Sequence, residues 1–369
     1  MPYGERTADG HSMKVVLSST RFAGSLYYRA AEPARAVHDA GLGVDVTVTY
    51  GLATTMDGPA EDENSSVLSV DAQGADVVVL QLPKTKAALE MLRLLQGQGV
   101  AVVVEMDDLM SGLAYGHLAY ATITKLKVPQ WAAACAREAD LVTVTTPALL
   151  AEYAKHGRGA IIPNAIPRRI AELPPAYERE PELVTVGWTG SVGVHPYDLQ
   201  TMESGLQQGL DRARTASRFM ILGQAMDAQR RLHLPEPPVE VSWKDTVDGY
   251  LTALGELFDI GIAPLRLDRF NDAKSWLKPM EYAARGVFAI RANTPDYERL
   301  GIGIRAKRPR DWADQIAKAV DDPDRRREIA ERNRETVLAG HLTEHTAPLW
   351  ADAWHRALDN RVRSQRIGA

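Results

Sequence analysis

The sequence predicts an α/β protein made of two doubly wound domains. The chain has 369 residues, too many for one ordinary core and about right for two. Short β-branched runs alternate with helical stretches, which is typical of parallel sheets covered on both faces. The alternation breaks once, in a Pro-rich stretch at 166–183, and then restarts. We therefore expect two Rossmann-like domains facing across a cleft, with ligands at the carboxyl ends of the strands.

The first domain is expected to span residues 13–166, after a polar disordered tail at 1–12 that lacks the apolar core of a signal peptide. A loop with Gly24 and a helix to about Ala40 should follow the first strand. Further helices are expected at 85–95 and from Pro147. The strands are expected at 14–17, 44–49, 76–80, 100–105, 141–144 and 160–162.

Four prolines among charged residues predict a linker at 167–182, and the second domain should then occupy 183–342. A C-terminal helix is expected at 343–369. The strands of the second domain are expected at 183–186, 218–222, 239–243, 259–263 and 287–290, and its helices at 197–213, 248–257 and 277–285.

The composition is that of a soluble globular protein, with 45% hydrophobic and 25% charged residues. No apolar run approaches the roughly 20 residues that a membrane-spanning helix needs. The single cysteine, Cys135, excludes an internal disulfide and is expected as a small buried side chain. These features favour a cytoplasmic protein. The net charge of −5 disfavours broad binding to duplex DNA.

Residues 271–290 are the most informative stretch for function. Pro279 is tolerated only in the first turn of a helix, so the helix should begin near 275–278 with its free N–H groups ready to bind a diphosphate. Lys274, Lys278 and Glu281 follow at helical spacing and should share one face. Two ammonium groups could neutralise a leaving diphosphate, and the carboxylate could accept ribose hydroxyls. An amphipathic helix with an exposed Lys–Glu face is an equal alternative.

A second candidate is the glycine-containing run 186–199. It predicts a strand leading into a loop with Gly187, Gly190 and Gly193, whose backbone could approach a phosphate. The spacing is not the dinucleotide-binding GxGxxG. His195 could contact phosphate or sugar, or lie exposed in the loop. Asp198 is expected mainly to stabilise the next helix N-terminus.

Two further candidates lie in the first domain. Asp107 and Asp108 end a buried strand in EMDD, where carboxylates often face a ligand, although capping explains one of them equally. His117, just downstream, could orient a sugar hydroxyl or be structural. After the first strand, Gly24 could bring backbone N–H groups to a substrate, and Arg21 and Arg29 could pair with phosphate or carboxylate.

These residues together resemble the GT-B glycosyltransferases of the family 4 type, in a bacterial and phage branch. KSWLKPMEYAARGV resembles the donor-site helix of that family, with Glu281 in the place of its glutamate. The likeness extends from Met13 to about residue 355. Its other segments are EMDD, TTPALLAEY, PNAI, VGWTGS and DIGIAPL.

The resemblance implies a retaining, metal-independent transferase without a resident cofactor, its UDP- or GDP-linked nucleotide sugar being a co-substrate. The donor would bind mainly to the C-terminal domain, with Glu281 on the ribose and Lys278 on the diphosphate. The C-terminal helix would return to the first domain. Further donor-side candidates are Lys274, Ser275, Trp276, Leu277, Gly190, Ser191, His195, Lys244 and Arg266. The first domain would bind the acceptor through Gly24, Arg21 and Asp108, with His117 and Asp107 near the reaction.

Two positions depart from the family pattern. Ala273 replaces the first of two glutamates eight positions apart, which leaves the donor sugar open. Trp188 stands where an arginine usually contacts the diphosphate, so Lys244, Arg266, Lys274 or Lys278 would supply the charge.

The leading hypothesis is therefore transfer of a sugar from a nucleotide sugar to a hydroxyl acceptor. Glycan, protein, metabolite and modified DNA base remain open as acceptors, and no stable membrane insertion is expected. The alternatives are a nucleotide-sugar epimerase of the same fold and a non-catalytic nucleotide-binding protein. The sequence does not indicate the oligomeric state.

Overall fold

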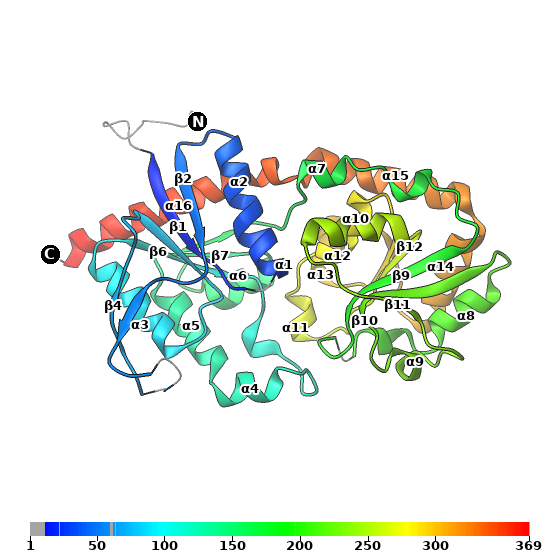
Figure 1. Ribbon diagram of the computed structural model, residues 1–369, viewed down its shortest axis with the longest axis horizontal. Helices are drawn as coiled ribbons and strands as arrows, with labels where there is room; N and C mark the ends of the chain where they lie inside the picture. The colour runs from blue at the N-terminus through cyan, green and yellow to red at the C-terminus, as the bar shows by residue number, and fades with distance from the viewer. Residues whose placement is uncertain (1–11, 22, 60–61, 63, 196, 369) are drawn as a thin grey trace. The chain divides into compact units, whose positions relative to one another are not determined.

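The computed structural model describes residues 12–21, 23–59, 62, 64–195 and 197–368. Apart from Ser12, the predicted disordered tail lies outside the described residues. The chain forms two compact units (Figure 1). Unit 1 comprises Met1–Asp107, Leu126–Ile162 and Thr346–Ala369, and unit 2 comprises Asp108–Lys125 and Pro163–His345.

Unit 1 is built on a six-stranded parallel sheet with the order β2-β1-β5-β6-β7-β8. Its strands are β1 (Met13–Ser18), β2 (Val44–Thr49), β5 (Val77–Gln81), β6 (Ala101–Met106), β7 (Leu141–Val144) and β8 (Gly159–Ile161). Its helices are α1 (Ala23–Leu26), the π-helix η1 (Tyr27–Ala31), α2 (Glu32–Asp39), α3 (Lys86–Gly97), α5 (Val128–Glu138) and α6 (Pro147–Tyr153), and most of α16 (Thr343–Gly368).

Both faces of this sheet are buried, as the continuous apolar runs predicted. Val15 and Leu17 of β1 pack on one face with Val37 of α2 and with Trp350 and Trp354 of α16. The alternate residues of the strands face the other way and are equally buried. They include Val16, Val78 and Val102.

A buried ion pair ties η1 to the sheet of unit 1. The Nε atom of Arg29 lies 2.7 Å from Oε1 of Glu105, and its Nη1 donates to the carbonyl oxygen of Ile162 at 2.7 Å. The guanidinium also lies 4.6 Å from the ring centroid of Trp350 in α16. Arg29 is 1% exposed, so the expectation that it pairs with a substrate is wrong. Its charge is used to hold β6 and α16 together.

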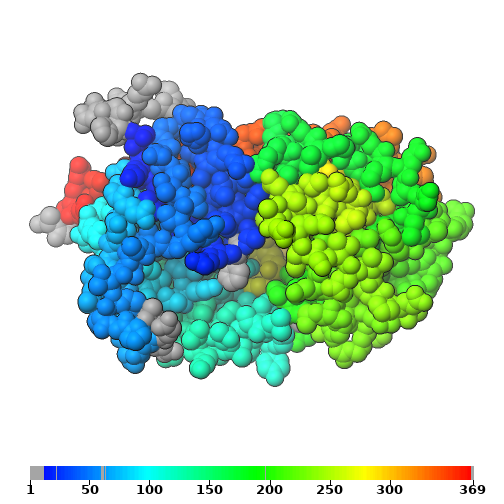
Figure 2. Space-filling view, in the orientation of Figure 1, coloured from blue at the N-terminus to red at the C-terminus, as the bar shows by residue number. Residues whose placement is uncertain are grey.

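Unit 2 has a second six-stranded parallel sheet, with the order β11-β10-β9-β12-β13-β14. Its strands are β9 (Val184–Ser191), β10 (Ser217–Gln224), β11 (Val239–Val241), β12 (Ile260–Ala263), β13 (Phe288–Arg291) and β14 (Ile304–Arg305). The longer helices are α8 (Gly205–Arg212), α10 (Val247–Leu257), α12 (Leu277–Ala284), α14 (Pro309–Asp321) and α15 (Pro323–Gly340). Helix α10 lies on the surface of unit 2 in the view of Figures 1 and 2. The predicted α/β class with two doubly wound domains is confirmed.

The short elements of unit 2 are α7 (Arg168–Ala171), α9 (Ala228–Arg231), α11 (Arg269–Asp272), α13 (Pro295–Leu300), α4 (Tyr120–Lys125) and the 3₁₀ helices η2 (Met110–Gly112), η3 (Ala176–Glu178) and η4 (Leu199–Met202). The Pro-rich stretch carries α7 and η3 and packs onto the rest of the unit. The guanidinium of buried Arg285 donates to the carbonyl oxygens of Ile170, Leu173 and Pro174.

The order of the strands locates the crevice of unit 2. The chain builds β9, then β10 and β11 on one side of it, and returns to place β12 on its other side. Ligands in such sheets bind where the order reverses, at the carboxyl ends of the two strands on either side of that point. The turn after β9 and the segment between β12 and α12 lie at this point.

Three local predictions for unit 2 are wrong. Gly187 and Gly190 lie within β9, because the strand stays paired with β10 as far as Ser191. The helix expected at 197–213 is split into η4 and α8, since Glu203 between them has a left-handed backbone with φ 47°. Lys274 precedes α12 and does not share its face. In unit 1, an antiparallel hairpin of β3 (Thr54–Met56) and β4 (Val67–Val70) was not expected.

Cys135 lies fully buried in α5 of unit 1, as the sequence predicted. Burial raises the pKa of its thiol to about 12, so the nucleophilic thiolate is scarce at neutral pH. Within the described residues, none of the helices combines the length and the apolarity needed to cross a bilayer.

Replacing Gly223 by alanine is expected to destabilise unit 2. Gly223 has φ +141°, and a Cβ there would lie 2.1 Å from the carbonyl oxygen of Gly190 in the neighbouring strand. Overpacking and backbone strain of this kind cost roughly 1–3 kcal/mol each. Urea unfolding would measure the loss. Gly97→Ala is the control, since Gly97 is exposed at the end of α3 with open space around it. Equal stability of the two variants would contradict the expectation.

Candidate functional site

The candidate donor site of unit 2 is organised by the entry into helix α12. Pro279 lies in the first turn, where it displaces no hydrogen bond of the helix. The N–H of Trp276 donates to Asp296 at 2.9 Å, and its indole Nε1 donates to the carbonyl oxygen of Asn164 at 3.2 Å. Ser275 accepts a hydrogen bond from the amide of Asn164 at 2.9 Å. The first turn is therefore fixed in place with its N-terminal end at the crevice.

Glu281 is buried on α12 rather than on an exposed helix face. Its side chain is 3% exposed, and its Oε2 accepts a hydrogen bond from the hydroxyl of Tyr250 at 2.8 Å. The same hydroxyl lies 3.1 Å from Oγ1 of Thr189 in β9. Burial, with the nearby charge of Glu281, raises the pKa of Tyr250 well above its usual value, so the phenol stays a donor. The exposed Lys–Glu face that was the alternative reading is ruled out.

Lys278 lies next to Trp188, the residue at the family's arginine position. Its Nζ is 6.0 Å from the centroid of the indole ring, which is buried in the core of unit 2. Burial, followed by the charge of Lys274, lowers the pKa of Lys278. A bound anion would offset part of the free-energy cost of keeping this buried ammonium charged. Lys278 is therefore a suitable partner for a diphosphate.

Lys274 lies in the segment that joins α11 to α12. Its Nζ is 3.4 Å from Oδ1 of Asp108 and 4.3 Å from the ring centroid of Phe270. The ion pair connects the donor segment to the 108–125 stretch of unit 2. Asp107, the other carboxylate of EMDD, belongs to unit 1, where its Oδ2 accepts a hydrogen bond from Ser25 at 2.8 Å.

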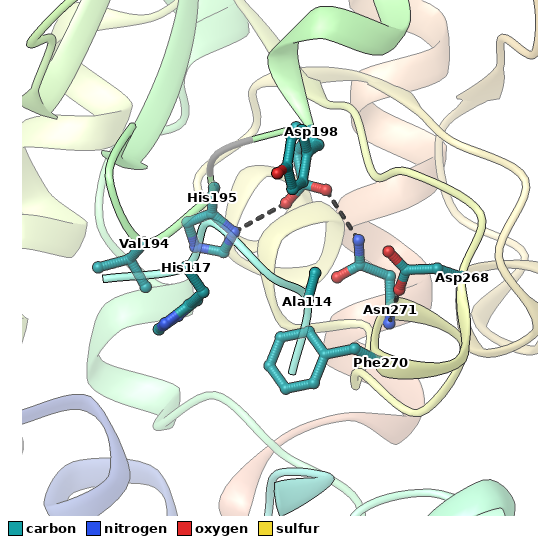
Figure 3. A pocket seen from close by; sticks show the side chains of 9 residues that line it. Ala114, His117, Val194, His195, Asp198, Asp268, Phe270 and Asn271 are labelled. Atoms are coloured by element: carbon teal, nitrogen blue, oxygen red, sulfur yellow. Dashed lines mark hydrogen bonds and ion pairs between the residues drawn. The ribbon is translucent and has the colours of Figure 1, made fainter. Parts of the chain in front are cut away.

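A pocket of unit 2 lies beside this segment (Figure 3). It has about 300 Å³ of space, part of it open to solvent. Its centre is an ordered polar chain: Nδ1 of His195 lies 2.8 Å from Oδ2 of Asp198, and Oδ1 of Asp198 accepts from Asn271 at 2.8 Å. The pocket is lined by Ala114, His117, Val194, His195, Tyr197, Asp198, Asp268, Phe270 and Asn271.

Asp198 is a buried anion that orients its neighbours. Its Oδ1 also accepts a hydrogen bond from the N–H of Arg266 at 2.9 Å. Burial opposes its ionisation, but the hydrogen bonds from His195 and from the N–H of Arg266 favour the carboxylate, and the pKa of Asp198 is lowered. Asp198 precedes η4 as expected, but its side chain makes no capping hydrogen bond to that helix.

His117 lines the same pocket (Figure 3). Its Nδ1 accepts a hydrogen bond from the N–H of Ala119 at 3.0 Å, and its ring lies 6.4 Å from that of Phe270. Burial, and then the charge of Lys274, lower its pKa. The structure thus brings His117 and His195 to one pocket, although 78 positions separate them in the chain.

The remaining donor-side candidates are residues of unit 2 that do not line this pocket. Ser191 donates to Gln224 at 2.8 Å at the end of β9. Arg266 pairs with Asp268 at 2.8 Å and stacks 4.5 Å from the ring centroid of Tyr197. Lys244 is exposed after β11. Leu277 begins α12. Gly190 has φ +147°, and a Cβ there would lie 2.6 Å from the ring of Trp188.

The acceptor-side candidates of unit 1 are exposed after β1. Gly24 lies in α1, and the guanidinium of Arg21 lies 5.9 Å from the ring centroid of Tyr50. Arg21 and Gly24 are both exposed to solvent. Among the described residues, no group of three or more His, Cys, Asp and Glu side chains is arranged to hold a metal ion.

Two residues of the site had not been singled out from the sequence. Tyr250 lies on α10, 31 positions before Glu281, and no local pattern links them. Asn271 belongs to α11, where Asp268 caps the helix through the N–H of Asn271 at 2.9 Å. The pairing of His195 with Asp198 could have been suggested by one signal, their spacing of three residues.

Comparison with known proteins relates unit 2 to glycosyltransferases. Residues 208–352 match a family model described as glycosyl transferase-like. A comparison with the sequences of curated proteins finds no match.

Solved structures of glycosyltransferases share the fold at low sequence identity. A glycosyltransferase from Rickettsia africae is 11% identical, with a TM-score of 0.61 over 95% of this chain and 99% of that one. Anabaena HepE in complex with UDP is 13% identical, with a TM-score of 0.57 over 92% and 98% of the two chains. A TarM mutant from S. aureus, in complex with UDP among other ligands, is 13% identical with a TM-score of 0.52.

The TarM match covers 69% of this chain but only 51% of that one, so the chain spans about half the length of that relative. The chain therefore shares the fold of these glycosyltransferases, with two Rossmann-like domains, and its residues 208–352 match the glycosyl transferase-like family model.

Proposed function

We propose that the chain is a glycosyltransferase that moves a sugar from a UDP- or GDP-linked donor to a hydroxyl acceptor. The observation that carries this proposal is the arrangement of Glu281 and Lys278 on one fixed helix. Glu281 is held by Tyr250 with its carboxylate buried, and Lys278 lies at the first turn. A carboxylate for the ribose and an ammonium for the diphosphate are thereby set one helical turn apart.

In this proposal the first turn of α12 and Lys278 bind the diphosphate, as helix N-termini bind anions. Lys274 adds charge from the preceding segment, while its pair with Asp108 sets its place. The barrier falls because positive charge is already positioned where negative charge grows as the sugar leaves. Crystals of related folds with UDP bound support a nucleotide donor.

The resemblance to family 4 enzymes extends the proposal to a retaining reaction without a metal ion. His117, Asp107 and Asp108 are the candidates to meet the transferred sugar or the acceptor, and Gly24 and Arg21 are the acceptor-side candidates of unit 1. The acceptor class stays open among glycan, protein, metabolite and modified DNA base.

A thermal-shift screen of UDP, GDP and ADP tests the donor site. A ligand that binds only the folded state at 100 times its Kd stabilises by about 2.7 kcal/mol. Each kcal/mol raises Tm by about 2–4 °C in a domain of 150–250 residues. We expect UDP or GDP to raise Tm by several degrees and Glu281→Ala to lose the effect. No shift with any diphosphate at millimolar concentration would overturn the proposal.

A further inference from the structure

His195 and Asp198 form a dyad whose geometry leaves one imidazole nitrogen for a ligand. Nδ1 of His195 is turned to Oδ2 of Asp198 at 2.8 Å, and the second nitrogen lies on the edge of the ring away from Asp198 (Figure 3). Asp198 is fixed by two further donors, the N–H of Arg266 and the amide of Asn271. Because the carboxylate accepts from Nδ1–H, the neutral ring presents a lone pair at Nε2.

The dyad lies beside the cation expected to bind the donor. The rings of His195 and Trp188 meet edge to face, with centroids 6.0 Å apart, and Nζ of Lys278 lies 6.0 Å from the centroid of the same indole. The side chain of His195 is 15% exposed. His195, Trp188 and Lys278 therefore form one cluster at the carboxyl end of β9.

In the structure His195 is neutral. Burial, together with the charges of Lys278 and Lys274, lowers the pKa of the imidazole to about 4, although the hydrogen bond and the charge of Asp198 act in the opposite direction. Besides His195 and Asp198, the titratable groups that line this pocket are His117, Tyr197 and Asp268. An anion within about 4–6 Å would favour the protonated ring, since such a neighbour raises the pKa of a cationic group by about 1–3.

We propose that His195 is a proton-coupled anchor for the diphosphate of the donor, taking up a proton from solvent on Nε2 when the anion binds beside Lys278. Asp198 is the positioning residue that holds the imidazole. The inference rests on the proposed function, because it needs a diphosphate at this end of α12. It also answers how a site with Trp188 in place of an arginine gains a second positive group, present only when the anion is there.

The sign of the pH dependence follows from proton linkage. The ligand-free ring is protonated only below about pH 4, whereas the ring in the complex stays protonated to a higher pH. Between these two values binding takes up protons, so the affinity falls as pH rises, by up to about tenfold per unit. Below and above that range of pH, His195 adds no pH dependence to the affinity for the diphosphate.

Calorimetric titration of the full chain with UDP at pH 5.5, in two buffers of different ionisation enthalpy, measures the proton uptake directly. The comparison variant is His195→Asn, whose amide can still donate to Asp198. Titration of the terminal phosphate of UDP is common to both proteins and cancels in the difference. His355→Asn is the matched control, because His355 is exposed on α16.

Wild type and His355→Asn are expected to take up roughly half a proton or more beyond His195→Asn. The affinity of His195→Asn should then vary less with pH between 5 and 7.5. His195→Gln serves as a second variant with the same expectation, should His195→Asn unfold. Binding of UDP with equal uptake in all variants would overturn the inference alone, and absence of UDP binding to wild type would overturn the proposed function with it.

Discussion

Replacing Glu281 by glutamine is expected to weaken UDP binding by about ten- to a hundred-fold. Hydrogen bonds to a charged group contribute about 1.5–3 kcal/mol, and 1.4 kcal/mol corresponds to a factor of ten. Glutamine keeps the size of the side chain but loses the charge and one acceptor for the ribose hydroxyls. Tyr250 can still donate to the remaining carbonyl oxygen, so α12 should keep its place. Calorimetric titration with UDP measures the change.

The control for Glu281→Gln is Glu335→Gln, an exposed glutamate on α15. It makes the same chemical change on the surface of unit 2, so its affinity for UDP should equal that of the wild type. If Glu281→Gln also binds UDP as tightly as wild type, the ribose role of Glu281 is excluded.

Replacing Lys278 by methionine is expected to lower kcat more than it lowers donor affinity. Loss of one preorganised group that stabilises charge in the transition state reduces kcat by about 10²–10³. The negative charge on the departing diphosphate is larger in the transition state than in the bound donor, so the ammonium matters more for turnover. Methionine has nearly the length of lysine and suits the half-buried position beside Trp188.

Rates of nucleoside diphosphate release and titrations with UDP, on the same preparations, separate the two effects of Lys278→Met. Lys318→Met serves as the control, because Lys318 is exposed on α14. A Lys278→Met protein with full turnover would show that the charge on the leaving group is stabilised elsewhere.

The sheets of this fold could be predicted from the sequence because each strand is a continuous apolar run. Val77, Val78 and Val79 are all fully buried, and such a run has one simple explanation in a parallel sheet. The hairpin of Thr54–Met56 and Val67–Val70 escaped prediction because its strands are short and partly exposed. Local sequence gives little signal for pairing of that kind.

Backbone conformations that depend on distant contacts were also out of reach. Gly190 suggested a loop, yet the strand continues because β10 pairs with it and Gly223 allows the close approach. Glu203 interrupts a stretch of good helical pattern with a positive φ that its residue type does not favour.

The candidate site was predicted in part. Glu281 and Lys278 stood out because Pro279 marks the helix start and their spacing follows from it. Lys274 was misplaced, since it was given a place on the helix face although it precedes the first residue of the helix. Tyr250 and the bond between Asn271 and Asp198 depend on elements brought together only by the fold.

The central claim is that unit 2 binds a nucleotide sugar through Glu281 and breaks its bond to the diphosphate. Incubation of the chain with UDP- and GDP-sugars, with water as the acceptor, followed by measurement of free nucleoside diphosphate, tests it most directly. We predict slow release by wild type with at least one donor, and release reduced by about tenfold or more in Glu281→Gln at low donor concentration. The account would be contradicted if the wild type released no diphosphate or converted the donor to another nucleotide sugar. It would also be contradicted if Glu281→Gln released diphosphate as fast as the wild type.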